Sequence, residues 1–144
     1  MIFAMDPGSE KTGIALVEED GSLCRKAVVP TADLEKHVAE YLDLQPVRAF
    51  VMGNGTRHRE IQKRMEALLR KRESDLRVSL VNEKYTTEMG EQRYKKEHPP
   101  KGLARLIPSG MRTVSVPVDD YVAWIIGEIY LGRVRPEDVG HRKI

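Results

Sequence analysis

The fold is indicated most directly by residues Ile2–Val17, which read Ile-Phe-Ala-Met-Asp-Pro-Gly-Ser-Glu-Lys-Thr-Gly-Ile-Ala-Leu-Val. The apolar runs Ile2–Met5 and Gly13–Val17 predict two buried strands. The segment Asp6–Gly8 ends the first strand, because proline and glycine interrupt regular structure. This stretch therefore predicts two neighbouring strands, with the carboxylate of Asp6 at the carboxyl-terminal tip of the first.

The elements that follow predict a mixed sheet with helices on both of its faces. A third strand, Leu23–Val29, comes after the turn Asp20-Gly21 and completes an antiparallel meander of three strands. Strand-like runs and helical periodicities then alternate, so the later strands should lie parallel to the first. The expected later strands are Val47–Met52 and Leu76–Val81. Helical stripes begin at Leu34, Ile61 and Val122, and a further helix ends near Tyr94. The expected helix caps are Thr31, Thr56 and Thr86 or Thr87. The sequence thus predicts an α/β fold with a five-stranded sheet.

The whole chain has the character of a globular domain. Its 144 residues suit one domain, 1–144, and 32% of them are charged. No stretch approaches the roughly 20 apolar residues that span a bilayer, and Met1–Asp6 lacks a basic segment, so neither a membrane span nor a signal peptide is expected. Cys24 is the only cysteine, which excludes an intrachain disulfide and predicts a reduced, buried thiol in a cytoplasmic protein.

Acidic residues stand at the ends of three predicted elements. Asp6 and Glu83 each follow an apolar strand, and Asp119 and Asp120 open the last helix. By helical phase Asp119 lies above Val122 on the apolar stripe, so Asp119 should point toward the sheet and Asp120 should cap the helix. Taken one at a time, these acids have ordinary explanations as turn residues, solvated loop residues and helix caps.

Three carboxylates in one cleft would repel one another and resist ionising together. Divalent cations remove that repulsion, and Mg²⁺ and Mn²⁺ prefer oxygen ligands. Asp6, Glu83 and Asp119 are therefore both the candidate catalytic residues and the candidate metal ligands, with Mg²⁺ or Mn²⁺ as the cofactor. Two such ions activate a water and stabilise the leaving oxygen of a phosphodiester.

A second set of residues predicts contact with nucleic acid, although the net charge of only +2 does not by itself identify such a protein. The turn Gly53–Thr56 joins a strand to a helix, where amides bind phosphate, and the segment 93–112 is rich in cations. A second basic cluster at 57–64 is better explained as a solvated helix face, and all four histidines are expected on the surface or in loops. The candidate substrate-binding residues are Lys11, Asn54, Thr56, Arg93, Lys101, Arg105 and Arg112.

Four segments resemble, in the same order, the motifs of the YqgF/RuvC-like group of RNase H-fold nucleases. They are Phe3–Gly8 continued by Lys11–Ala15, then Val51–Thr56, Val81–Thr87 and Val118–Ala123. The resemblance implies an RNase H-like fold, a metal-dependent nuclease or resolvase activity, and catalytic positions for Asp6, Glu83 and Asp119. YqgF-type members are associated with maturation of precursor small-subunit ribosomal RNA, and RuvC-type members cut four-way DNA junctions, usually as dimers. Nucleic acid, either RNA or branched DNA, and a homodimer are thus the expected partners.

The sequence departs from the group in two places. The acidic motif usually reads Asp-Glu-Arg, whereas this chain has Asn82-Glu83-Lys84, and the segment 98–117 is longer than usual. A strand order of 3-2-1-4-5 also leaves one strand between Asp6 and the strand before Glu83. Because strands lie about 4.7–4.9 Å apart, Glu83 must then reach across two such spacings.

Two other classes of function remain open from the sequence. Actin-like ATPases and sugar kinases have a related fold and a similar phosphate loop, but they use two such domains, and 144 residues provide one. A non-catalytic nucleic-acid-binding module is the other alternative. Nucleotide-dependent turnover would indicate the first class, and binding without metal-dependent cleavage would indicate the second.

Overall fold

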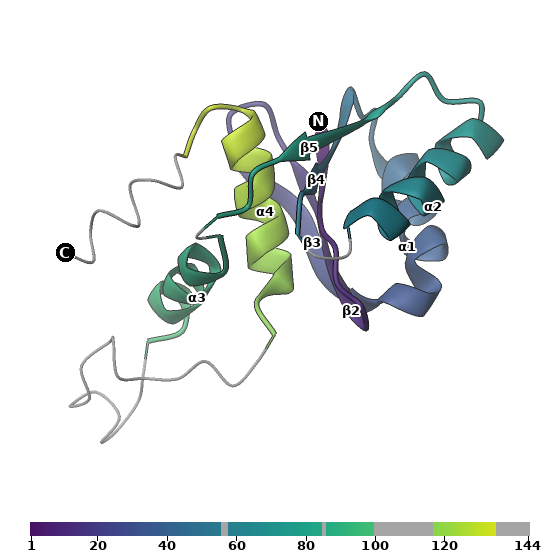
Figure 1. The fold of residues 1–144 in the computed structure, drawn as a ribbon. Helices are drawn as coiled ribbons and strands as arrows, with labels where there is room; N and C mark the ends of the chain where they lie inside the picture. The colour runs from purple at the N-terminus through teal and green to yellow at the C-terminus, as the bar shows by residue number, and fades with distance from the viewer. Residues whose placement is uncertain (56–57, 85, 100–116, 135–144) are drawn as a thin grey trace.

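The computed structural model describes residues 1–55, 58–84, 86–99 and 117–134. Five strands form one sheet in the order β3-β2-β1-β4-β5 (Figure 1). Strand β1 is antiparallel to β2 and parallel to β4, so the mixed sheet and its predicted order are confirmed. The strands are β1 (Ile2–Asp6), β2 (Lys11–Val17), β3 (Leu23–Pro30), β4 (Ala49–Gly53) and β5 (Val78–Val81).

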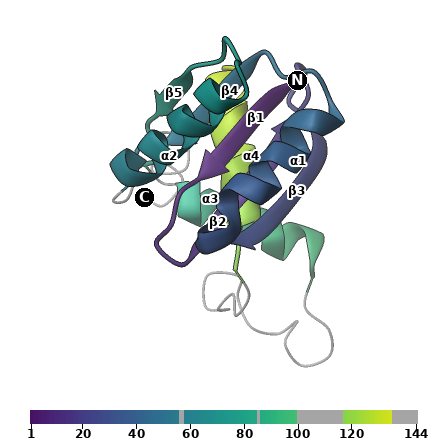
Figure 2. The same cartoon turned by 90° about the vertical axis from the view of Figure 1, so that its right-hand side faces the viewer.

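Helices cover both faces of the sheet, as predicted (Figure 2). Helices α1 (Leu34–Leu44) and α2 (His58–Lys71) lie on one face, and α4 (Asp119–Tyr130) lies on the other. Helix α3 (Thr86–Glu97) packs against α4, and the short 3-10 helix η1 (Thr31–Asp33) leads into α1. No helix within the described residues is long and apolar enough to cross a membrane.

The two faces of the sheet carry side chains of different size. The face under α1 and α2 is built from large residues such as Phe3, Met5 and Phe50. The face under α4 is built from small ones, including Ala4 and Ala15. Because side chains alternate along a strand, this division predicts a closer approach of α4 than of α1 and α2 to the sheet.

Glycines confirm that α4 lies close to the sheet. A Cβ added at Gly13 in β2 would overlap the backbone carbonyl of Asp119 at the start of α4. A Cβ added at Gly127 would lie 3.4 Å from the Cβ of Ala4 and closer still to Val17. The main chain of α4 therefore touches the sheet at its first residue.

The structure contradicts three local predictions, which concern Thr31, Cys24 and the start of β5. Thr31 does not cap a helix, because its hydroxyl donates to the carbonyl oxygen of Gly8 at 2.9 Å and pairs with the Thr12 hydroxyl at 2.8 Å. These bonds hold the turn that follows Asp6. Cys24 is exposed rather than buried, because β3 is an edge strand with an outward-facing side. Strand β5 starts only at Val78, the residue that pairs with Phe50 near the start of β4.

We predict that Gly13→Ala destabilises the protein by about 1–3 kcal/mol, the usual range for overpacking. The added methyl group meets a backbone carbonyl, which moves only if the start of α4 moves. Gly90→Ala is the matched control, because the nearest atom to its Cβ is Cγ2 of Val122, at 2.9 Å, the tip of a side chain. Urea titration should show a larger loss of stability for the first variant than for the second. Equal losses would contradict the close backbone contact.

Candidate active site

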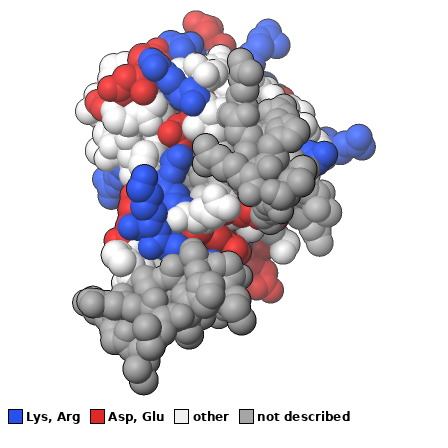
Figure 3. Space-filling view, turned by 90° about the vertical axis from the view of Figure 1, so that its left-hand side faces the viewer, with Lys and Arg blue, Asp and Glu red and all other residues white. Residues whose placement is uncertain are grey.

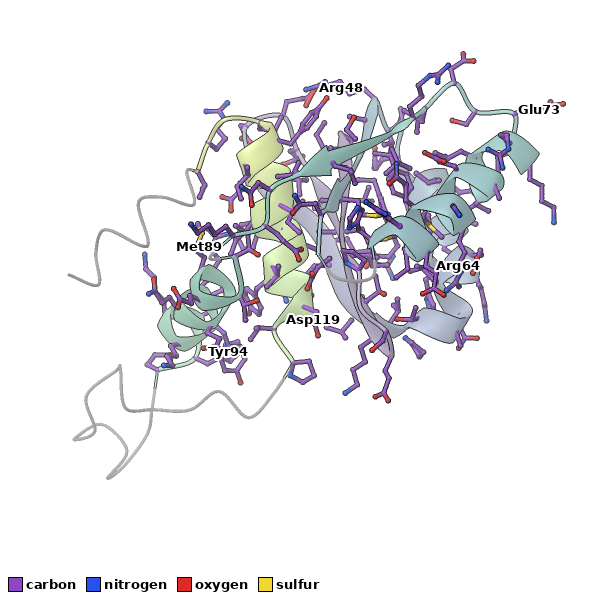
Figure 4. All side chains as sticks on the ribbon, viewed as in Figure 1. Arg48, Arg64, Glu73, Met89, Tyr94 and Asp119 are labelled. Atoms are coloured by element: carbon purple, nitrogen blue, oxygen red, sulfur yellow. The ribbon has the colours of Figure 1, made fainter. Side chains whose placement is uncertain are left out.

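The three acidic residues predicted to act together lie at one edge of the sheet. Asp6 is the last residue of β1, Glu83 lies two residues beyond the end of β5, and Asp119 is the first residue of α4 (Figure 4). Met5 pairs with Met52, so Asp6 lies level with Gly53, which in turn pairs with Val81. Side-chain alternation puts Asp6 on the same face as Ala4, which is the face covered by α4.

Electrostatic interactions connect the three carboxyl groups through Asp6. Burial first, and then the nearby charges of Glu83 and Asp119, raise the pKa of Asp6 from 3.8 to about 8. The Asp6 carboxyl is within hydrogen-bonding reach of both partners. Asp6 therefore lies between the other two acids, and it holds a proton at neutral pH unless a cation replaces that proton.

Glu83 reaches Asp6 by passing over the end of β4. A Cβ added at Gly53 or at Gly55 would overlap the carboxylate oxygens of Glu83, so that carboxyl group lies directly on these glycines. Its Oε2 atom is buried and has no hydrogen-bond partner among the residues that the structure describes. Burial raises the pKa of Glu83, while hydrogen bonding to Asp6 and the charge of His58 act in the opposite direction.

The two aspartates that open α4 separate as helical phase predicts, but Asp120 is not the cap. The N-cap position is occupied by Val118, whose side chain makes no capping hydrogen bond, and Oδ1 of Asp120 accepts a hydrogen bond from the backbone N–H of Tyr121 at 2.9 Å. Asp120 instead forms an ion pair with Lys26 of β3, with 2.6 Å between Oδ2 and Nζ. This pair holds Asp120 toward β3, on the other side from the carboxyl groups of Asp6 and Glu83.

The donor set fits a hard divalent cation in its chemistry. All three side chains offer carboxylate oxygens, one carboxyl group needs a proton in the absence of a cation, and one buried oxygen lacks a partner. Within the described ranges, no three Asp, Glu, His or Cys side chains yet surround a common point as metal ligands do. The carboxyl groups instead follow one another in the series Glu83, Asp6, Asp119.

The structure places three of the predicted substrate-binding residues and does not describe the other four. Lys11 is exposed at the start of β2, on the same edge of the sheet as the tip of β1. Asn54 accepts a hydrogen bond from the backbone N–H of Glu83 at 3.3 Å, so it supports that residue's backbone. Arg93 forms an ion pair with Glu128 at 2.5 Å and lies over the Trp124 ring, which gives it a structural role. Thr56, Lys101, Arg105 and Arg112 lie outside the described residues.

The surface around α3 and α4 agrees with this reading of Arg93. On the face shown in Figure 3, Lys and Arg side chains gather next to acidic side chains. Two of the ion pairs formed by these helices are Lys26–Asp120 and Arg93–Glu128. Cations held in this way contribute less to binding a phosphate backbone than unpaired ones do.

His58 is the residue near the site that sequence reasoning missed. It was expected at the surface, but it is partly buried at the start of α2, and its Nδ1 lies 2.6 Å from the carbonyl oxygen of Gly55. Its charge acts on Glu83 and opposes the rise in the pKa of that carboxyl group that burial causes. The signal in the sequence was its place just after a strand end, where active-site residues of parallel sheets gather.

The raised pKa of Asp6 predicts how the stability of the metal-free protein depends on pH. A carboxyl group whose pKa is higher in the folded state stabilises that state at low pH, and this contribution is lost as the pH rises toward 8. In EDTA, the free energy of unfolding should therefore fall as the pH rises from about 5 to about 8, since each pKa unit corresponds to about 1.36 kcal/mol.

The test compares wild type with Asp6→Asn in urea titrations across this range. The variant should remove most of the fall. Glu35→Gln is the control, because hydrogen bonding from Arg64 lowers the pKa of Glu35 and keeps it ionised throughout the range. A wild-type profile that is flat or rises with pH would contradict the burial of Asp6 among the other acids.

Comparison with solved structures identifies the fold. No family model and no curated protein matches the chain. The structure of RuvC from Thermus thermophilus matches with a TM-score of 0.51 and 14% identity, over 92% of this chain and 94% of that one. A candidate sugar kinase from Cytophaga hutchinsonii matches with a TM-score of 0.43 and 15% identity, over 63% of this chain but only 38% of its own. At this identity the likeness concerns the fold alone, and the chain has the RNase H-like α/β fold that RuvC also has.

Proposed function

We propose that this chain is a divalent-metal-dependent endonuclease that hydrolyses phosphodiester bonds in structured nucleic acid. One observation carries the proposal: the carboxyl groups of Glu83 and Asp119 both lie against that of Asp6 at the carboxyl edge of the sheet. A structural role explains each acid alone, but it does not explain why three acids from distant segments lie close together and partly buried. Such crowding raises the free energy of the metal-free site, and bound cations relieve it.

Asp6, Glu83 and Asp119 are the residues that would hold Mg²⁺ or Mn²⁺. Asp6 lies between the other two and would contribute to every ion bound there. Because its carboxyl group must lose a proton on binding, metal affinity should increase as the pH rises toward 8. The ions would supply an activated water and would offset negative charge on the phosphate.

The fold and the sequence motifs support the substrate class that we propose. The motifs resemble those of a group that includes junction-cutting and ribosomal-RNA-maturing members, and the fold is similar to that of RuvC. We propose four-way DNA junctions as the first substrate and structured precursor ribosomal RNA as the second, with a homodimer as the working assembly on junctions. The exposed cations Lys11 and Arg59 flank this edge of the sheet and would contact the phosphate backbone.

The neighbouring residues Asp119 and Asp120 provide a matched test of this proposal. Asp119→Asn and Asp6→Asn should each reduce cleavage by at least the roughly 10–100-fold that follows loss of even an outer partner of a metal ligand. Asp120→Asn should cut at nearly the wild-type rate, because Asp120 forms an ion pair with Lys26 away from the site. Cleavage of labelled junctions and precursor RNA is measured with Mg²⁺, with Mn²⁺ and with EDTA, and EDTA should abolish it.

The other outcomes identify other functions. Equal cutting by wild type and Asp6→Asn would exclude this site from the chemistry. Binding of either nucleic acid without metal-dependent cutting would indicate a binding module. Turnover of a nucleoside triphosphate would indicate the class of actin-like ATPases and sugar kinases.

A further inference from the structure

The position of Glu83 needs an explanation in the fold. Strand β4 lies between β1 and β5, so the backbone next to Glu83 is two strand spacings, roughly 9.5 Å, from that next to Asp6. Glu83 also lies two residues beyond Val81, the residue level with Asp6 across the sheet. Its side chain therefore has to run back over the end of β4 to meet Asp6.

Two glycines at the end of β4, Gly53 and Gly55, leave space for the side chain of Glu83. A Cβ on Gly55 would overlap Oε1 of Glu83 and lie 3.0 Å from its Cδ, and the nearest atoms to that Cβ all belong to Glu83. A Cβ on Gly53 would overlap Oε2 of Glu83 and lie 2.9 Å from Cδ1 of Ile126. The carboxyl group thus fills the space that two ordinary side chains would occupy.

The backbone of this turn does not itself require glycine. Among the described glycines only Gly21 and Gly132 have positive φ, so Gly53 and Gly55 adopt conformations open to any residue. The requirement at both positions is therefore space. The space on that side is taken by a carboxylate, which disfavours the phosphate-binding role that the sequence predicted for this turn.

Hydrogen bonds hold the turn and Glu83 together. Asn54 donates its backbone N–H to the carbonyl oxygen of Val81 at 3.0 Å, and its side chain accepts from the N–H of Glu83. The carbonyl oxygen of Glu83 accepts from the backbone and the hydroxyl of Thr86 at 3.0 and 2.6 Å. His58 binds the carbonyl oxygen of Gly55 through both its backbone N–H and its ring.

We infer that Gly53 and Gly55 are positioning residues for Glu83: their missing Cβ atoms leave the path by which its carboxyl group crosses β4 to the other two acids. The expected effect on cation binding rests on the proposed function, whereas the placement of Glu83 over the two glycines does not. Gly55 is the cleaner test position, because the nearest described atoms to its Cβ all belong to Glu83.

The experiment is a double-mutant cycle of Gly55→Ala and Glu83→Ala, with Mn²⁺ affinity measured by isothermal titration calorimetry. Each single variant should weaken Mn²⁺ binding by about tenfold or more, because each removes the same carboxylate from the site. The double variant should bind no more weakly than Glu83→Ala alone. Wild-type affinity in Gly55→Ala, or a further loss in the double variant, would overturn the inference.

A second readout of the same cycle does not depend on metal or on activity. In EDTA, Gly55→Ala should raise the urea midpoint in the Glu83→Ala background, because alanine restricts the unfolded chain and meets no clash there. In the wild-type background it should give a smaller rise or a fall. Glu40→Ala, at an exposed position of α1, is the control second site, and in its background the effect of Gly55→Ala should equal that in wild type.

The two readouts separate failure of the inference from failure of the proposed function. Equal midpoint shifts in the wild-type and Glu83→Ala backgrounds would refute the positioning role even if the protein cuts nucleic acid. A wild-type chain that binds no Mn²⁺ but shows unequal shifts would refute the metal-dependent function and keep the positioning role.

Discussion

Helix α4 lies close against the sheet because the residues between them are small, and the geometry of the candidate site depends on that closeness. Ala4, Ala15 and Gly13 line the sheet side, and Gly127 lines the helix side. The opposite face carries phenylalanine and methionine, and α1 and α2 pack against them. A larger residue at Gly13 would displace the first turn of α4, and with it Asp119, from the tip of β1.

The site brings together three acidic side chains, which repel one another when they are ionised. Three carboxyl groups approach one another, and the central one, Asp6, holds a proton up to about pH 8 in the absence of cations. A fold that gained nothing from this arrangement would lose little by replacing one acid with an apolar or amide side chain. The crowding supports the proposal that this site binds a divalent cation, for which carboxylate oxygens are suitable ligands.

The supporting parts of the site use glycines and hydroxyls in different ways. Gly53 and Gly55 leave room for a side chain that comes from another strand. Thr12 and Thr31 form a buried pair that holds the turn after Asp6 through the carbonyl of Gly8. The Lys26–Asp120 ion pair holds Asp120 away from Asp6, so that Asp119 is the aspartate of α4 that faces Asp6.

The sequence by itself determined the order of the elements, the mixed sheet and the three acids, because apolar periodicity and turn residues act over a few neighbouring positions. It also separated Asp119 from Asp120, since helical phase is a local property. Only the tertiary structure decided how Glu83 reaches Asp6, why Gly53 and Gly55 are glycines, and that Arg93 and Asp120 are taken up by ion pairs. These features join residues far apart in the chain, and no local pattern encodes which distant side chain will fill a given space.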